Sequence, residues 1–196
     1  ETLEKAFKSA ASFRPKENEA SLEGIYMEGP FISPNKIGAQ NPKFLKPLDL
    51  DFFKTLQKVS GNLIKCLVVA PELDGAIDFI KEVKDKVRVS LGHTNCDYQT
   101  ASSAFEAGAR ELTHTFNAMP PMLHRAPGPI VAASENAKVL AELICDGVHV
   151  NPAMVRMAFK LFSKDNIVMI SDSMMATGLE NGTYALGGQK VLVNEN

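Results

Sequence analysis

The stretch "SLGHTNCDYQTASSAFEAGARELTHTF", residues 90–116, contains two of the chain's four histidines. His93 and His114 each come soon after an apolar run, and between them residues 97–108 predict a helix that ends at Gly108. Strand, helix and strand form the unit of a parallel sheet, in which the crossover helix returns the chain to begin a neighbouring strand. The stretch therefore predicts an α/β fold with both histidines at the carboxyl ends of two neighbouring strands.

The same alternation continues along the rest of the chain. Apolar segments that lack a polar face predict six strands, which suits a parallel sheet covered by helices on both sides. Both an open doubly wound sheet and a barrel fit this pattern. The tail, residues 183–196, alternates apolar and polar residues and predicts a hairpin. The strands are expected at 22–32, 63–72, 87–93, 110–116, 138–147 and 166–174, and the helices at 1–13, 49–61, 73–85, 97–108, 130–136 and 151–162.

Composition narrows the class of protein. The chain has 196 residues, a net charge of -2, 45% hydrophobic residues and 22% charged residues, which is typical of a soluble globular domain. There is no basic stripe for nucleic acid, and no apolar run approaches the roughly 18–20 residues that span a bilayer. The three cysteines lie far apart without a C-x-x-C pair, which disfavours a disulfide framework and indicates a reducing, cytoplasmic environment.

Acidic residues and histidines gather where the predicted strands end. In a parallel α/β fold the carboxyl ends of the strands open on one face, where active sites are built. Glu72, which follows a proline after the second strand, is expected to face solvent. The residues that end or follow the other five strands are Glu28, His93, His114, Asp146 with His149, and Asp172.

A lone histidine is more often a packed core residue than a ligand, and a lone strand-end acid often caps a helix. Their coincidence on one face is less easily explained in this way. One carboxylate and two imidazoles, from Glu28, His93 and His114, suit Zn²⁺ or Fe²⁺ and leave a coordination position open for water. Asp172 is then free to act on that water, whereas His149 suits a supporting or substrate-binding role.

Five longer motifs resemble, in order and spacing, the N-acetylglucosamine-6-phosphate deacetylases of the amidohydrolase superfamily. The resemblance runs from about Glu23 to the end of the chain. The motifs are "GIYMEGPFISPNKIGAQNP" (24–42), "SLGHTNCDY" (90–98), "THTFNAMPPMLHRAPG" (113–128), "CDGVHVNP" (145–152) and "ISDSMMATG" (170–178).

The resemblance implies a role for each matching residue. Glu28, His93 and His114 would bind a divalent metal, zinc or iron, and Asp172 would be the catalytic acid–base. His149 would polarise the acetamide carbonyl of N-acetylglucosamine 6-phosphate, which is hydrolysed to glucosamine 6-phosphate and acetate. In the implied homodimer, an arginine reaches the phosphate in the partner subunit's site. The implied substrate contacts are Ala39, Gln40, Asn117, Ala118, His149 and Arg125, the last being that arginine.

The implied fold is a (β/α)₈ TIM-type barrel of the metal-dependent hydrolase kind. Residues 1–182 are expected to form strands 3 to 8 of it, and residues 183–196 the start of a small β-sandwich. Such an incomplete barrel would leave two strand edges unpaired. Two alternatives remain open: an inactive or metal-free fragment of such an enzyme, and an amidohydrolase for another N-acyl substrate.

The chain departs from the family pattern at two positions. Tyr26 stands where the family often has the histidine of H-x-E-G-P, and Gln40 stands where some members have histidine. The H-x-H pair of members with a second metal is absent from the sequence.

Overall fold

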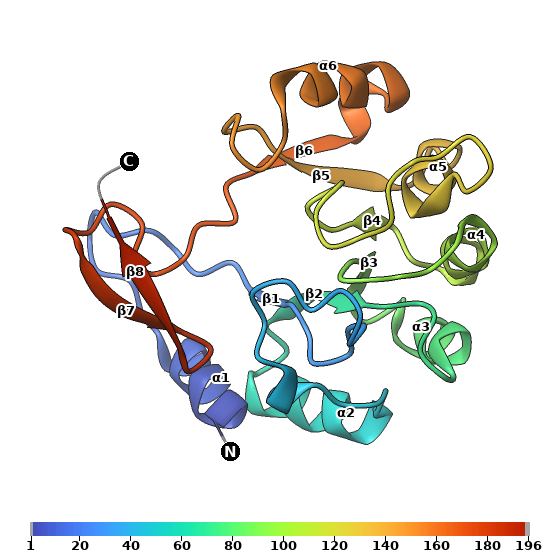
Figure 1. The fold of residues 1–196 in the computed structure, drawn as a ribbon. Helices are drawn as coiled ribbons and strands as arrows, with labels where there is room; N and C mark the ends of the chain where they lie inside the picture. The colour runs from blue at the N-terminus through green and yellow to red at the C-terminus, as the bar shows by residue number, and fades with distance from the viewer. Residues whose placement is uncertain (1, 195–196) are drawn as a thin grey trace.

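The computed structural model describes residues 2–194. Six parallel strands form one sheet in sequence order, and the sheet curls into an incomplete barrel that is open between its first and last strands (Figure 1). This confirms the partial TIM-type barrel and excludes the open doubly wound sheet. The strands are β1 (Ile25–Met27), β2 (Ile64–Val69), β3 (Arg88–Leu91), β4 (Glu111–Leu112), β5 (Leu140–Ile144) and β6 (Ile167–Ile170).

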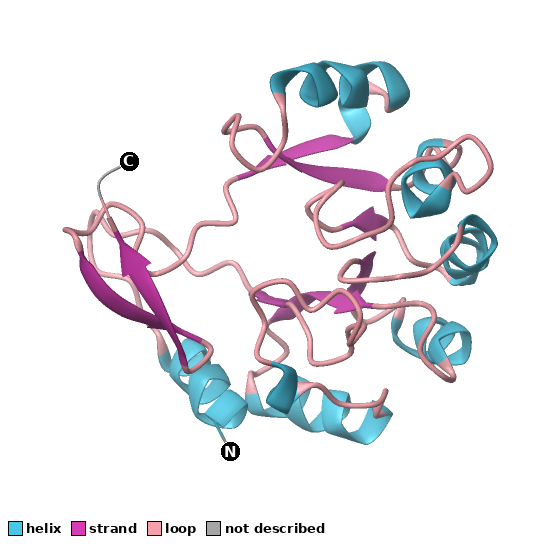
Figure 2. Ribbon diagram, viewed as in Figure 1, coloured by secondary structure: helices cyan, strands magenta, loops and turns pink. Residues whose placement is uncertain are grey.

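Helices connect the strands and cover the outside of the curl (Figure 2). Side-chain caps fix several helix starts: Asp49 accepts the backbone N–H of Phe52, and Asp97 accepts that of Thr100. The helices are α1 (Thr2–Ser12), α2 (Leu50–Val59), α3 (Ala76–Val83), α4 (Tyr98–Ala107), α5 (Gly128–Ser134) and α6 (Pro152–Leu161), with short 3₁₀ turns η1 (Pro42–Phe44) and η2 (Lys164–Asn166).

The main hydrophobic core lies between the strands and this helical layer. Three phenylalanines pack edge to face within it: Phe31 contacts Phe79 at a ring-centroid distance of 5.4 Å, and Phe53 contacts Phe79 at 6.4 Å. Edge-to-face packing suits the quadrupoles of the rings. These contacts hold the segment after β1 against α2 and α3, so the outer layer determines where the carboxyl ends of the first strands lie.

The inner face of the curled sheet is polar, which the sequence pattern did not predict. The strands were expected to be apolar on both faces, yet Glu111, Glu142, Ser90 and Thr113 are buried. Glu142 occurs within the otherwise apolar strand "LAELI", and its side chain reaches the inner face rather than the helical layer. Barrel interiors are usually filled by branched apolar side chains. This interior is instead held together by hydrogen bonds.

The tail forms the expected hairpin, from β7 (Gly182–Leu186) and β8 (Gln189–Val193). This small antiparallel sheet fits the start of a C-terminal β-sandwich. Its turn contacts the loop after β1, because Gln189 Nε2 donates to the Ala39 carbonyl at 2.8 Å. The division at residues 182 and 183 stays a prediction, and residues 195–196 lie outside the described residues.

The open side of the barrel exposes apolar side chains. Strand β6 lies at one end of the sheet, and Met169 is 72% exposed there. Tyr26, on β1 at the other end, is 41% exposed. These two strands are the unpaired edges that the resemblance implied. Among the described helices, none combines the length and apolar character needed to cross a membrane.

A close approach between β3 and β4 requires glycine at residue 92. A Cβ atom built there would lie 2.5 Å from Thr113 Cβ and 2.8 Å from Thr113 Oγ1, closer than packed carbon atoms come, and it would also be tight against Val68 Cγ1 at 3.0 Å. We therefore expect Gly92→Ala to lower the free energy of unfolding by about 1–3 kcal/mol, the usual cost of overpacking. Denaturant unfolding measures this. In the control Gly182→Ala the new Cβ meets only ordinary contacts, and an equal loss there would refute the steric explanation.

Candidate metal centre

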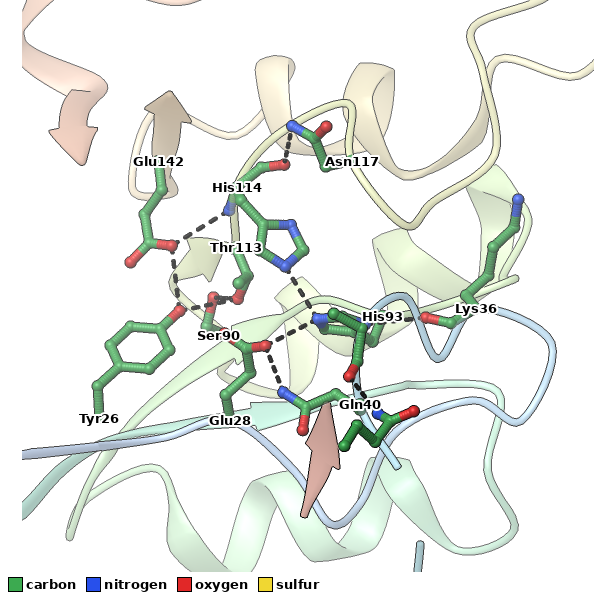
Figure 3. Close-up of polar contacts among 12 residues, drawn as sticks. Tyr26, Glu28, Lys36, Gln40, Ser90, His93, Thr113, His114, Asn117 and Glu142 are labelled. Carbon is green, nitrogen blue, oxygen red and sulfur yellow. Dashed lines mark hydrogen bonds and ion pairs between the residues drawn. The ribbon is translucent and has the colours of Figure 1, made fainter. Parts of the chain in front are cut away.

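Three predicted ligands converge at the carboxyl ends of neighbouring strands (Figure 3). Glu28 follows β1, His93 follows β3 and His114 follows β4. One ligand atom from each lies within 4.8 Å of the others. The strands deliver these residues because each crossover helix returns the chain to the same end of the sheet. Glu28 and His93, which are 65 residues apart in the sequence, are thereby brought into contact in the fold.

The hydrogen bonds of His93 determine which of its ring nitrogens carries a proton. Nδ1 lies 2.8 Å from the Lys36 carbonyl, which can only accept, so Nδ1 carries the proton. In a neutral ring, Nε2 then carries a lone pair and no proton. That atom lies 2.9 Å from Glu28 Oε1 and 3.0 Å from His114 Nε2. A neutral His93 would therefore aim its lone pair at a carboxylate oxygen.

Two arrangements relieve this convergence of lone pairs: a second proton on His93, or a cation among the three residues. Both histidines are buried, with 4% of each exposed, and His114 Nδ1 finds no partner among the described residues. Imidazole nitrogen and carboxylate oxygen are ligands that Zn²⁺ and other borderline divalent ions prefer. The donor set and its geometry therefore fit a divalent metal.

The charges of the site alter the pKa of each member. Burial by itself would lower the pKa of His93, but the hydrogen bond and charge of Glu28 outweigh burial and raise it. Burial would raise the pKa of Glu28, but the His93 contact outweighs it and lowers that pKa. Burial and the neighbouring His93 lower the pKa of His114, so its ring favours the neutral form that binds metals.

Strained backbone is concentrated at this site. His93, His114 and Asp172 adopt φ angles of +46°, +28° and +51°, and Phe116 and Ala118 are also positive. Residues other than glycine rarely occupy this region, because it costs on the order of 1–3 kcal/mol and persists only where surrounding contacts enforce it. The chain therefore changes direction sharply after β3, β4 and β6, at His93, His114 and Asp172, and this orients the three side chains.

Asp172 lines the same cavity as two of the ligands. The cavity has a volume of about 580 Å³, and its wall includes Glu28, His114, Asp172 and, deeper in the barrel, Tyr26. Asp172 keeps contact with solvent, yet partial burial followed by the charge of Glu28 raises its pKa. A carboxylate with a raised pKa beside a metal site is suited to accept a proton from water.

Several of the predicted substrate residues lie around the ligands. Gln40 Nε2 donates to Glu28 Oε1 at 2.8 Å, so it holds the ligand carboxylate. Asn117 Nδ2 donates to the His114 carbonyl at 3.3 Å. The Ala118 carbonyl accepts the Thr94 N–H at 3.1 Å and so connects the loops after β4 and β3. Ala39 is exposed beside Gln40. Their contacts with substrate stay predictions.

His149 and Arg125 are exposed and lie on separate loops. Asp146 orients His149: its Oδ2 lies 2.7 Å from His149 Nδ1, and its Oδ1 accepts the His149 backbone N–H at 2.9 Å. These hydrogen bonds hold the pKa of Asp146 at about 2. His149 acts on Asp172 in the opposite direction to burial and Glu28, and it offsets only part of the rise in the pKa of Asp172. Arg125 lies in a short turn closed by a bridge between Leu123 and Ala126.

Sequence reasoning missed two supports of the ligands. Glu72 does not simply face solvent: its carboxylate accepts the Thr94 hydroxyl and the Asn95 N–H, and so anchors the loop after His93. Glu142 accepts the backbone N–H of His114 at 3.2 Å. A glutamate within an apolar strand was the available signal for Glu142, whereas Glu72 carried none.

No protein-family model matches the chain, but curated proteins and solved structures do. The chain is 42% identical to N-acetylglucosamine-6-phosphate deacetylase of Bacillus subtilis over 175 residues, which cover 89% of this chain and 44% of that protein. It is 37% identical to N-acetylgalactosamine-6-phosphate deacetylase of Escherichia coli O157:H7, over 88% of this chain and 46% of that protein.

A solved structure shares the fold. It is a mutant of the Mycobacterium smegmatis N-acetyl-D-glucosamine-6-phosphate deacetylase in complex with N-acetyl-D-glucosamine-6-phosphate, with a TM-score of 0.91 and 34% identity, over 98% of this chain and 50% of that chain. The chain thus spans about half the length of the relatives it matches. Over that half, it is a homologue of the N-acetylglucosamine-6-phosphate deacetylases.

Proposed function

We propose that the protein hydrolyses N-acetylglucosamine 6-phosphate to glucosamine 6-phosphate and acetate, in amino-sugar catabolism. The observation that carries this proposal is the convergence of Glu28, His93 and His114 within 4.8 Å, in a chain whose relatives are deacetylases of this kind. The donor set favours zinc, with iron as the other candidate. When bound there, such a metal would act as a Lewis acid and lower the pKa of water.

Asp172 is the proposed acid–base. Its position in the cavity beside Glu28 and His114 allows it to accept the proton of the attacking water. It then returns that proton to the nitrogen of the scissile amide, because an amine cannot leave as an anion. The pKa of Asp172, already raised by burial and by Glu28, makes its carboxylate a better base.

Two exposed residues would recognise the remaining parts of the substrate. His149, held by Asp146, would donate to the acetamide oxygen as negative charge develops on it. Arg125 would form paired hydrogen bonds with the phosphate, from one subunit of a homodimer into the partner's site. Three free thiols, Cys66, Cys96 and Cys145, support a cytoplasmic location.

Two other functions remain candidates. The relative from Escherichia coli O157:H7 acts, by its name, on the galactosamine epimer, which favours a second N-acyl amino-sugar phosphate as an alternative substrate. The second alternative is a chain that binds no metal or has no activity by itself. Turnover of both epimers and metal content, measured on one preparation, distinguish these possibilities.

Metal content tests the proposed ligands. We expect His93→Ala to remove most bound zinc, because two remaining ligands hold a metal far less tightly than three. His124→Ala is the matched control, since His124 lies exposed on the loop before Arg125. Elemental analysis of the purified variants measures this. Full zinc content in His93→Ala would remove that residue from the ligand set.

Turnover tests Asp172. We expect Asp172→Asn to retain zinc and substrate binding but to lower kcat by about 10²–10⁴-fold, because the amide cannot accept the proton of water. Asp165→Asn, at an exposed turn before β6, serves as the control. A kcat within a few-fold of the parent protein would show that another group carries the proton.

Selectivity tests Arg125. We expect Arg125→Ala to raise KM for the phosphorylated sugar by about 10–100-fold while leaving plain N-acetylglucosamine unaffected, because a charged hydrogen-bonded pair contributes about 1.5–3 kcal/mol. Arg156→Ala, on the exposed face of α6, is the control. Equal effects on both sugars would argue against a phosphate contact.

A further inference from the structure

A continuous series of hydrogen bonds crosses the polar inner face and ends at the backbone of His114 (Figure 3). Ser90 Oγ lies 2.6 Å from Thr113 Oγ1, which lies 2.9 Å from the Tyr26 hydroxyl. That hydroxyl donates to Glu142 Oε2 at 3.1 Å, and the same oxygen accepts the His114 N–H at 3.2 Å. Ser90, Thr113 and Glu142 are buried.

The direction of each hydrogen bond follows from its last member. The Tyr26 hydroxyl donates its single proton to Glu142 Oε2, so it has no proton left to donate to Thr113. The Thr113 hydroxyl must then donate to Tyr26, and Ser90 must donate to Thr113. Every hydroxyl proton is thereby assigned, and both donors to Glu142 Oε2 are fixed in place. A fully satisfied network of this kind holds its members in one arrangement.

The network acts at a strained peptide. Strand β4 ends at Leu112, and His114, two residues later, adopts a φ of +28°. The Tyr26 hydroxyl is hydrogen-bonded to both residues of the Thr113–His114 peptide. It contacts the Thr113 side chain directly, and it reaches the His114 N–H through Glu142. Strain of this size persists only where neighbouring groups enforce it.

The same strand supplies Tyr26 and a metal ligand. Tyr26 and Glu28 are two residues apart on β1 and the segment that follows it, so both side chains point to the inner face. Tyr26 is 41% exposed, and its ring adds little to the packed core. What it contributes to the site is its hydroxyl.

We propose that Tyr26 is a positioning residue for the metal ligand His114, and that it acts through Thr113 and Glu142. The inference rests on the proposed metal centre. Without the hydroxyl, Glu142 loses one donor and Thr113 loses its acceptor. The peptide at His114 is then free to relax from its strained φ, which turns the ring away from Glu28 and His93.

Tyr26→Phe removes the hydroxyl alone. We expect its zinc affinity, measured by competition with a chelating dye, to fall by about 10-fold or more, as is usual when a group supporting a ligand is lost. Tyr98→Phe is the matched control, because the Tyr98 hydroxyl also donates to a carboxylate, that of Glu135 on the surface. It should keep the parent affinity. An equal loss in both variants would overturn the proposal.

Thr113 provides a second pair of variants. Thr113→Val removes the hydroxyl with little change of shape and should weaken zinc binding as Tyr26→Phe does. Thr113→Ser keeps the hydroxyl and should restore affinity to within about 3-fold of the parent protein. If both Thr113 variants bind zinc as tightly as the parent, the hydroxyl series does not position His114.

A metal-free measurement separates this inference from the proposed function. Exchange of the His114 amide hydrogen with deuterium, followed with ¹⁵N-labelled histidine, should become about 10-fold faster in Tyr26→Phe. Faster exchange in a protein that binds no zinc would sink the proposed metal centre and leave the positioning role standing. Unchanged exchange and unchanged zinc affinity, with only a lower Tm, would show that Tyr26 merely stabilises the fold.

Discussion

The candidate site brings together three hydrogen-bond acceptors, on Glu28, His93 and His114. They would repel one another without a positive charge between them. Because Lys36 fixes the proton of His93 on Nδ1, Nε2 of that ring must face Glu28 and His114 as a lone pair unless a positive charge stands there. The fold enforces this geometry through strand ends rather than through contacts among the ligands themselves. A positive charge at that point, whether a proton or a metal, is therefore what the surrounding structure is built to hold.

The polar interior of the half-barrel follows from the same requirement. Apolar side chains pack a barrel well, but they cannot hold a peptide such as that of His114 at a positive φ. Hydrogen bonds from Glu142 and Tyr26 can, since each has a fixed direction and a fixed partner. Burying Glu142 carries a cost, which is visible in its pKa: burial, followed by the hydrogen bond and charge of Glu111, raises the pKa of this carboxyl group above its ordinary value.

Sequence periodicity predicted the strand–helix order, the hairpin and the positions of Glu28, His93 and His114 at strand ends, because each depends on local pattern and on the handedness of crossovers. It overestimated the strands: β4 has only two residues where seven were expected, since the backbone turns sharply at His114. The side chain of Glu142 reaches the inner face, and Glu72 contacts Asn95. Both depend on residues far apart in the sequence, so local periodicity does not predict them.

The two histidines and the two acids of the site are supported differently by the sheet. His93 and His114 follow inner strands that are paired on both sides, whereas Glu28 and Asp172 follow β1 and β6 at its two ends. Gln40 holds Glu28 by a hydrogen bond, but the Asp172 side chain keeps solvent contact. Any segment that covers β6 would remove water from Asp172, and loss of water raises the pKa of a carboxyl group. Cover over β6 would therefore make the Asp172 carboxylate a stronger base.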